Sequence, residues 1–430
     1  MLRFFVIIFL LASCANLNKS LFNKKLSTTN PSQQITQQQT QKSTNSIASL
    51  PQTNNHLESY NISSEDGNKT MAKTKIAIFL PFSSKNKDIA QNIANATILS
   101  LFENDKYHKL ELVFIDSKET AQEQKLAFQE IVDRGIKTVI GPIYSNSINI
   151  IDPIAKEYGI TVISLSNNID MLGKIFDNGG GVFIAGILLE TQIEKIVNYA
   201  ISQDKNNFAI LAPNNQYGKI TTEYLKKFVK IRGGNFISSE FYDKEQDLDY
   251  VSNKLINSFI LPPKYHAKQP ISESDKQYPQ LIMIPESGNI LTKAVIALKK
   301  QNTNELDLQL IGTSQWDEIS TLEDSNLFGS WFAAPAPQGF ADFKKRYQQY
   351  FNKIPSRISS IAYDAVLAIS QLQKEPTAKN LIDRKDGFKG IDGDFRFLPN
   401  GAVQRNLAIL EVGIANFEIV DKPNNRFLRY

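Results

Sequence analysis

Few residues of this chain could support metal or thiol chemistry. Cys14 is the only cysteine among 430 residues, so it cannot form an intramolecular disulfide or a cysteine-based zinc site. The three histidines, His56, His108 and His266, lie far apart without the spacing of metal ligands. The motifs G-x-S-x-G, H-E-x-x-H and G-x-x-x-x-G-K-[ST] are absent. We therefore expect no metal site, no cofactor and no enzymatic activity.

Two short patterns have the composition or spacing of a metal, catalytic or phosphate site. Asp392 and Asp394 in GIDGDFRF have the spacing of metal ligands or paired catalytic carboxylates, but the flanking glycines and the following aromatic residues favour a tight turn into a strand. Gly179–Gly181 could suggest a phosphate cradle, yet the triplet precedes the strand-like VFIAG. We interpret both patterns as turns.

Cys14 has a specific sequence context. Arg3 and the apolar run from Phe4 to Leu11 are typical of a secretory signal peptide. The run is far shorter than the roughly 20 residues that span a bilayer. Residues 11–14, LASC, resemble the bacterial lipobox, in which the cysteine is acylated and becomes the new amino terminus. The alternative is an ordinary signal peptide with an accidental or buried cysteine.

The lipobox interpretation divides the amino-terminal part of the chain. Residues 1–13 become a lipoprotein signal peptide, and Cys14 attaches the mature protein to a membrane. Ala15 is not the aspartate that retains many lipoproteins in the inner membrane, so an outer-membrane location facing the periplasm is favoured. Residues 14–72 are rich in Gln, Ser, Thr and Asn, which predicts a disordered polar tether.

Composition indicates a globular body after the tether. Hydrophobic residues make up 42% of the chain and charged residues 21%, and a chain of this length usually forms two lobes or domains. The net charge of +4 is scattered, which argues against a nucleic-acid partner.

From residue 73 the hydrophobic pattern alternates buried strands with amphipathic helices, as in parallel sheets covered on both faces. The alternation restarts after residues 177–186, which predicts two doubly wound α/β lobes joined by a hinge, with ligands binding beyond the carboxyl ends of the strands. Lobe 1 is assigned to residues 73–188 plus 335–390, and lobe 2 to 189–334 plus 391–430. The proline-rich segment 260–279 reads as a loop insertion. The expected strands are 73–82, 109–116, 137–143, 160–166, 207–213, 235–242, 280–286 and 308–314, and the expected helices are 119–134, 147–158, 188–203, 219–232, 248–258 and 289–301.

Several stretches resemble the type I periplasmic binding fold of the leucine/isoleucine/valine-binding superfamily. They are VIGPIYSNSINIIDPIAKEYGITVISLSNN, FAILAPNNQYGKITTEYLKKFVKIRGG, SSIAYDAVLAI and FKGIDGDFRFLPNGAVQRNLAILEV. Within it, KIAIFLPFS, GSWFAAPAP and the proline-rich insertion before LIMIP are similar to the penicillin-binding protein activator lipoproteins. Larger members of that family carry a helical-repeat domain, and here the polar tether stands in its place.

The resemblance implies positions for a ligand in the cleft between the lobes. Ser145, Ser164, Ser166 and Tyr217 fall where amino-acid-binding relatives hold the ligand, although such residues also commonly form turns and caps. Gln315 stands where those relatives place the acid that pairs with the ligand's ammonium group. Asp317 lies slightly beyond and could reach in or cap a helix.

The resemblance and the anchor together imply an outer-membrane lipoprotein that promotes peptidoglycan synthesis by contacting a penicillin-binding protein. The alternative is a substrate-binding lipoprotein that delivers leucine, isoleucine, valine or a related solute to an ABC importer. A third hypothesis is that the protein is a sensor or scaffold that binds a wall fragment in the cleft.

Overall fold

The structure is a computed structural model that describes residues 73–168, 175–259, 279–303, 306–372, 374–424 and 427. The signal peptide expected at 1–13, the lipidation site Cys14, the tether expected at 14–72 and nearly all of the insertion at 260–279 lie outside the described residues. Within the described part of the chain, no helix has the length and hydrophobicity needed to span a bilayer.

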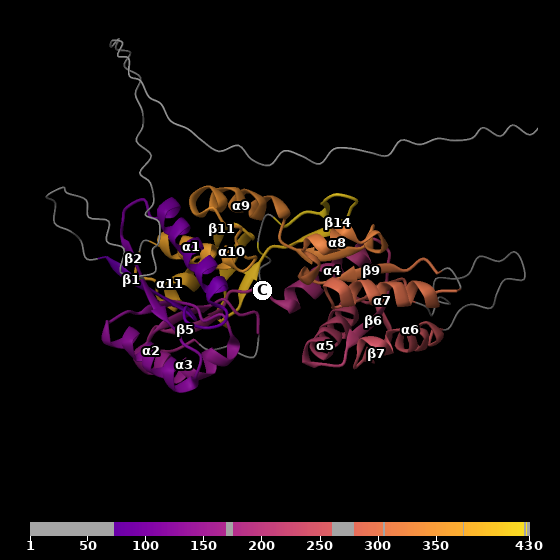
Figure 1. Cartoon of the computed structure of the whole chain (residues 1–430), viewed down its shortest axis with the longest axis horizontal. Helices are drawn as coiled ribbons and strands as arrows, with labels where there is room; N and C mark the ends of the chain where they lie inside the picture. Colours follow the sequence, from indigo (N-terminus) through magenta and orange to yellow (C-terminus); the bar gives the residue numbers. More distant parts are fainter. Residues whose placement is uncertain are drawn as a thin grey trace, which may run out of the picture. The chain divides into compact units, whose positions relative to one another are not determined.

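The first lobe is built on a five-stranded parallel sheet in the order β2-β1-β3-β4-β5 (Figure 1). The side chains of β1 alternate between its two faces. Ile76, Ile78 and Leu80 pack with helices α1 and α10, while Ala77 and Phe79 pack with α2 and α3. Both faces are therefore buried, as the continuous apolar strands predicted. The elements are β1 (Thr74–Leu80), α1 (Lys87–Asn104), β2 (Leu110–Asp116), α2 (Ala121–Asp133), β3 (Thr138–Ile140), α3 (Ser145–Tyr158), β4 (Thr161–Ser164) and β5 (Gly181–Ile184).

The second lobe is built on a seven-stranded sheet in the order β15-β14-β10-β9-β8-β6-β7, in which β14 is antiparallel to both of its neighbours and the other strand pairs are parallel. Strand β6, next to the edge strand β7, is buried along its whole length between α4 and α5 on one face and α6 and α7 on the other. The elements are α4 (Leu189–Ser202), β6 (Asn207–Pro213), α5 (Gln216–Ile231), β7 (Asn235–Tyr242), α6 (Leu248–Asn257), β8 (Leu281–Met283), α7 (Gly288–Gln301), β9 (Gln309–Gly312), α8 (Ile319–Glu323), β10 (Trp331–Ala334), β14 (Ala408–Val412) and β15 (Phe417–Asp421).

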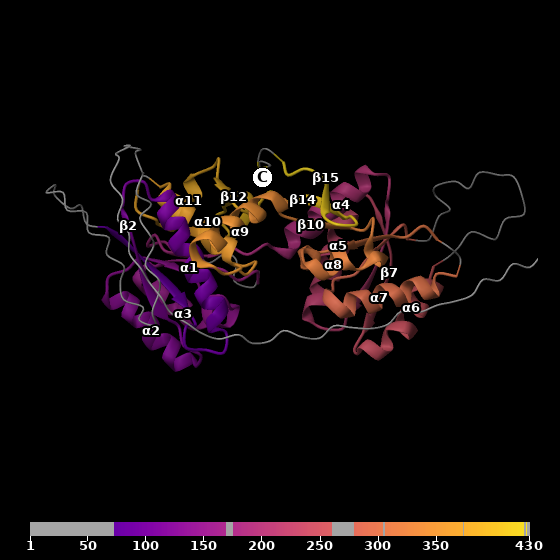
Figure 2. The same ribbon diagram turned by 45° about the horizontal axis from the view of Figure 1, so that its top comes forward.

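After β10 the chain returns to the first lobe. Figure 2 shows α9, α10, α11 and β12 beside α1, although more than 200 residues separate them in sequence. Helix α10 packs along α1, and a three-stranded antiparallel sheet of β11, β12 and β13 places Phe388, Phe395 and Phe397 in the same core as β1. These elements are α9 (Pro337–Phe351), α10 (Ser359–Ser370), α11 (Ala378–Asp383), β11 (Phe388–Gly390), β12 (Gly393–Phe397) and β13 (Val403–Arg405).

The chain thus crosses between the lobes three times: between β5 and α4, between β10 and α9, and between β13 and β14. The division expected between residues 390 and 391 falls inside the β11–β12 hairpin. Residues 391–405 pack with the first lobe because the aromatic side chains of β12 complete its core, and only β14 and β15 extend the second sheet.

Candidate functional site

In the first lobe, the predicted serines follow two neighbouring strands. Ser164 ends β4, and its hydroxyl donates to the carbonyl of Pro142, which follows β3, at 3.0 Å. The Ser166 hydroxyl accepts from the amide of Asn168 at 3.0 Å. Both serines are buried; the Ser164 hydroxyl links the turns that follow β3 and β4, and the Ser166 hydroxyl stabilises the turn after β4. Ser145, the first residue of α3, is half-buried at the same edge of the sheet.

In the second lobe, Tyr217 meets a hydroxyl that sequence reasoning did not identify. Its phenol oxygen lies 3.1 Å from Oγ1 of Thr313, the residue after β9. Asn215 caps α5 by accepting from the amide of Gly218, which sets Tyr217 in the first turn of that helix. Burial raises the pKa of the Tyr217 hydroxyl, so the group is a neutral hydrogen-bonding partner at neutral pH.

The segment after β9 is oriented by a buried indole. Trp316 is fully buried and donates through Nε1 to the carbonyl of Glu286 at 2.9 Å. Its ring lies against Gly312, where an added Cβ would approach a ring carbon to 2.2 Å. With Trp316 directed inward, the side chain of Gln315 is exposed. Gln315 therefore presents its amide to solvent. Asp317, the next acid along the chain, is instead largely buried.

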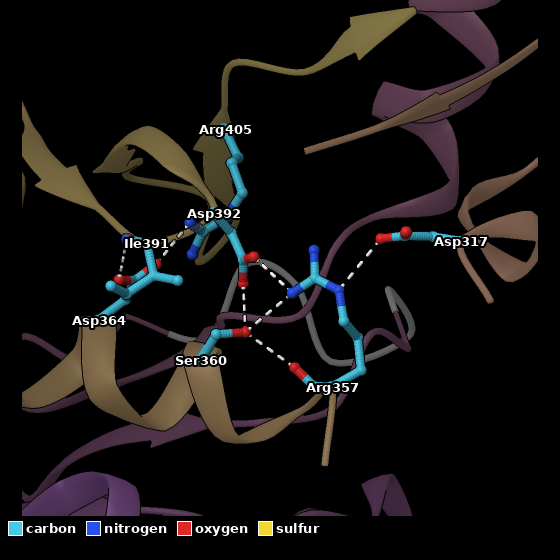
Figure 3. A network of polar contacts seen from close by, with 7 residues as sticks. All are labelled: Asp317, Arg357, Ser360, Asp364, Ile391, Asp392 and Arg405. Atoms are coloured by element: carbon cyan, nitrogen blue, oxygen red, sulfur yellow. Dashed lines mark hydrogen bonds and ion pairs between the residues drawn. The ribbon is translucent and has the colours of Figure 1, made fainter. Parts of the chain in front are cut away.

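Asp317 pairs with an arginine from the other lobe (Figure 3). Nε of Arg357, which precedes α10, lies 3.1 Å from Oδ2 of Asp317. Burial raises the pKa of Asp317, and the Arg357 guanidinium opposes that shift. The second arm of the guanidinium places Nη1 2.5 Å from Oδ1 of Asp392 and 3.0 Å from the Ser360 hydroxyl. One cation thus serves two carboxylates.

A second buried ion pair lies beside the first. Nη1 of Arg405 is 2.6 Å from Oδ2 of Asp364, and both side chains are almost completely buried. The amide of Ile391 donates to Oδ1 of the same carboxylate at 2.6 Å. Burial raises the pKa of Asp364 to about 6, although Arg405 lowers it. Gly390 leaves room for this carboxylate, since a Cβ there would approach Oδ2 to 2.5 Å.

The two sequence patterns that imitated chemical sites both lie in turns. Gly390 and Gly393 pair across the β11–β12 hairpin, so Asp392 sits in its tight turn, and Asp394 pairs with exposed Lys389 at 2.5 Å. Gly179 ends a turn in the left-handed region, with φ at 92°, and Gly181 begins β5. The turn interpretation is confirmed in both cases, but the burial of Asp392 beside Arg357 was not predicted.

The site's charges are matched inside the protein. Within the described residues, no group of three or more His, Cys, Asp or Glu side chains is placed to hold a metal ion. Asp317, Asp364 and Asp392 each pair with an arginine. The arrangement therefore supplies hydroxyl groups at the strand ends and a neutralised carboxylate where the lobes meet. The hydroxyl groups can hydrogen-bond a ligand, and the paired carboxylate can hold the lobes in position.

The lobes, the parallel sheets and the three crossings define a two-lobed binding fold of the type I periplasmic class. The periplasmic binding protein family matches residues 73–416, and the chain belongs to this family. A curated relative, an uncharacterized protein of Rickettsia prowazekii, is 23% identical over 273 residues, covering 61% of this chain and 68% of the relative.

Solved structures share the fold at low identity. A branched-chain amino acid ABC transporter ligand-binding protein of Burkholderia xenovorans superposes with a TM-score of 0.61 at 14% identity, covering 81% of this chain and 94% of that one. An ABC transporter substrate-binding protein of Desulfitobacterium hafniense in complex with leucine gives 0.57 at 18% identity, covering 81% and 100%. A solute-binding protein of Rhodopseudomonas palustris in complex with benzoate gives 0.56 at 14% identity, covering 82% and 97%.

Proposed function

We propose that this protein is an outer-membrane lipoprotein, anchored through acylated Cys14, whose periplasmic binding-fold domain promotes peptidoglycan synthesis by contacting a penicillin-binding protein. The observation that carries the proposal is that residues 313–317, the second-lobe segment directly after β9, present no unpaired acid to a ligand. Gln315 is exposed and neutral, and Asp317 is already paired with Arg357. The protein is proposed to act through its surface, without transferring an amino acid.

An amino acid brings an ammonium group to its binding site. A buried cation is costly unless a carboxylate with good geometry neutralises it. At this place the described chain offers Asp317, and an amino acid would have to compete with Arg357 for that carboxylate. Moving Arg357 aside would also disturb its contact with fully buried Asp392. This arrangement disfavours α-amino acids and supports a role in protein contact, in line with the similarity of KIAIFLPFS and GSWFAAPAP to the activator lipoproteins.

The test uses the acylated full-length protein and the peptidoglycan synthases of the same cell. We expect one synthase to bind it in a pull-down and to form glycan strands or cross-links faster in its presence. A matched preparation carrying Cys14→Ser separates contact from anchoring, because it should still bind the synthase in solution. If neither preparation binds or stimulates any synthase, the proposal is wrong.

A second candidate is a solute receptor for an ABC importer. The observation in its favour is the set of hydroxyl groups at the strand ends, from Ser145 in the first lobe to Tyr217 and Thr313 in the second. Hydroxyl groups suit a carboxylate that carries no ammonium, such as the benzoate bound by the Rhodopseudomonas protein. Ser164 and Ser166 were also candidates, but their hydroxyls are already engaged in turns.

Thermal unfolding distinguishes the two candidates. A ligand at 100 times its Kd stabilises the native state by about 2.7 kcal/mol, which is a readily measured rise in Tm. Leucine, benzoate and a muropeptide are the probes, representing an amino acid, a plain carboxylate and a wall fragment. We expect no rise with leucine; a clear rise would favour the importer receptor and overturn the argument from Asp317.

A further inference from the structure

The pairing of Asp317 with Arg357 joins the two lobes. Asp317 follows β9 and Trp316, whose ring belongs to the core of the second lobe. Arg357 precedes α10, whose side chains belong to the core of the first lobe. The 3.1 Å contact between Arg357 Nε and Asp317 Oδ2 therefore crosses from one lobe to the other, at a point separate from the three covalent crossings.

Contacts within the first lobe already fix the position of the guanidinium. Asp392, whose side chain is fully buried, pairs with one arm, and the Ser360 hydroxyl accepts from the same nitrogen (Figure 3). The ring of Phe340 lies 4.4 Å from Cζ and covers one face of the guanidinium. Because these contacts already restrict the side chain, little conformational entropy remains to be lost when Asp317 joins them.

We propose that Arg357 is an interlobe tie: its guanidinium takes the place at Asp317 that a ligand's cationic group would take, and so holds the two lobes together without a solute. In a two-lobed binding domain, a solute is held by groups from both lobes, and its contacts favour the closed state. Here the protein's own side chain makes that contact. The tie also makes Arg357 a specificity-determining residue, because it excludes amines and ammonium groups from Asp317.

A contact near the carboxyl terminus agrees with this assignment. Beyond β15 of the second lobe, the Asn424 carbonyl accepts from Nδ2 of Asn406 at 2.7 Å. Phe427 then lies against the first lobe, with its ring 4.9 Å from Cζ of Arg396. Gly387 makes room for that ring, since a Cβ there would approach it to 2.7 Å. The chain therefore connects the lobes a second time through side chains.

The choice of variant follows from the burial of Asp392. Removing the Arg357 charge would leave that fully buried carboxylate without its cation, which destabilises the fold itself. Asp317→Asn removes only the interlobe half and leaves Arg357 paired with Asp392. Asp116→Asn is the matched control: its carboxylate pairs with Lys118 at 2.7 Å inside the first lobe, and the exposed fractions of the two aspartates are similar, 22% and 19%.

The experiment measures the distance between the lobes in the full chain. Because Cys14 is the only cysteine, a Cys14→Ser background accepts two spin labels, at exposed Lys125→Cys on α2 and exposed Glu223→Cys on α5. Pulsed dipolar spectroscopy without any ligand should give one narrow distance distribution. We expect Asp317→Asn to broaden it or add a longer distance, and Asp116→Asn to leave it unchanged.

Two results would overturn the tie: an unchanged distribution in Asp317→Asn, or a parent chain that is broad until leucine or benzoate is added. Far-UV circular dichroism and Tm of each variant show that the lobes remain folded. The measurement includes no synthase, so its outcome is independent of the proposed function. A tied domain that binds no synthase would reject the function alone, and a mobile domain that binds one would reject the tie alone.

Discussion

Three aspartates differ in their surroundings although each pairs with an arginine. Asp364 and Arg405 are buried on all sides, Asp392 is buried against a half-exposed Arg357, and Asp317 reaches that same arginine from the other lobe. The cost of removing a charge from water rises with burial, so the same type of pair has a different role in each place. Protonation of Asp364 should be measurable as a pH dependence of the free energy of unfolding.

We predict that Asp364 gives the domain a component of stability that falls as the pH rises from about 4 to 6. Carboxylates whose pKa is lowered, such as that of Asp116, contribute in the opposite direction. Burial raises the pKa of Asp364 to about 6 from an ordinary value of 3.8, so between these values the folded state binds the proton more tightly than the unfolded state. Stability from this group is fully present below pH 4 and is lost as the pH passes 6. The raised pKa of Asp317 acts in the same direction.

The measurement is the free energy of unfolding by urea at several pH values. Two pKa units correspond to about 3 kcal/mol for a single group, which sets the scale of the fall. Asp364→Asn should lower stability at pH 7, because buried Arg405 loses its anion, and should flatten the curve between pH 4 and 6. Asp394→Asn, which removes a carboxylate paired with exposed Lys389, is the control that should keep the slope. An equally steep curve in Asp364→Asn would contradict the prediction.

A second residue-scale prediction concerns Gly312. An added methyl group would meet the Trp316 ring at 2.2 Å, and that ring is fully buried and cannot move aside freely. Overpacking of this kind costs about 1–3 kcal/mol, so Gly312→Ala should lower the free energy of unfolding by that amount. Gln315→Ala, three residues away and exposed, should change it by less than about 0.5 kcal/mol. Equal effects in urea unfolding would show that Trp316 does not anchor this segment.

At the scale of elements, local signals predicted much of the structure. The strand expected at 207–213 coincides with β6, and the helix expected at 188–203 extends one residue beyond α4 at each end. Helix α1 was not assigned a range in the sequence analysis. Its buried face mixes apolar Ile93 and Leu99 with small and polar residues such as Ser100. That face packs against α10, which lies more than 250 residues away in sequence. A periodicity within α1 cannot identify so distant a partner.

Helix α2 offers a direct test of local signals. Its amino terminus has a capping box: the Glu123 amide donates to Thr120 Oγ1 at 3.3 Å, and the Thr120 amide donates to the Glu123 carboxylate at 3.2 Å. Thr120→Ala should lower the free energy of unfolding by about 1 kcal/mol, whereas Thr120→Ser should nearly preserve it. Urea unfolding checks this, and a loss of equal size in both variants would mean that the hydroxyl does not act as the cap.

At the scale of the whole molecule, pairing between the lobes depends on topology. Asp317, Arg357 and Asp392 meet only because the chain leaves the second lobe after β10, builds α9 and α10 in the first, and then turns through the β11–β12 hairpin. The sequence analysis identified Asp317 as a residue that could reach into the ligand site, and it placed Asp392 in a tight turn. It did not find Arg357, since the order of crossings that brings the three together is a property of the complete fold.

The location of the whole protein rests on Cys14. If this cysteine carries the three acyl chains of a mature lipoprotein, burial at about 0.8 kcal/mol per CH₂ makes attachment to the membrane effectively permanent. We therefore predict that the protein sediments with outer membranes and that Cys14→Ser moves it to the soluble fraction. Arg3→Ser, which leaves the cysteine in place, is the control and should remain with the membranes once exported. Sedimentation of Cys14→Ser with the membranes, resistant to high salt, would contradict a lipid anchor, because salt releases electrostatic contacts and the described domain offers no spanning helix.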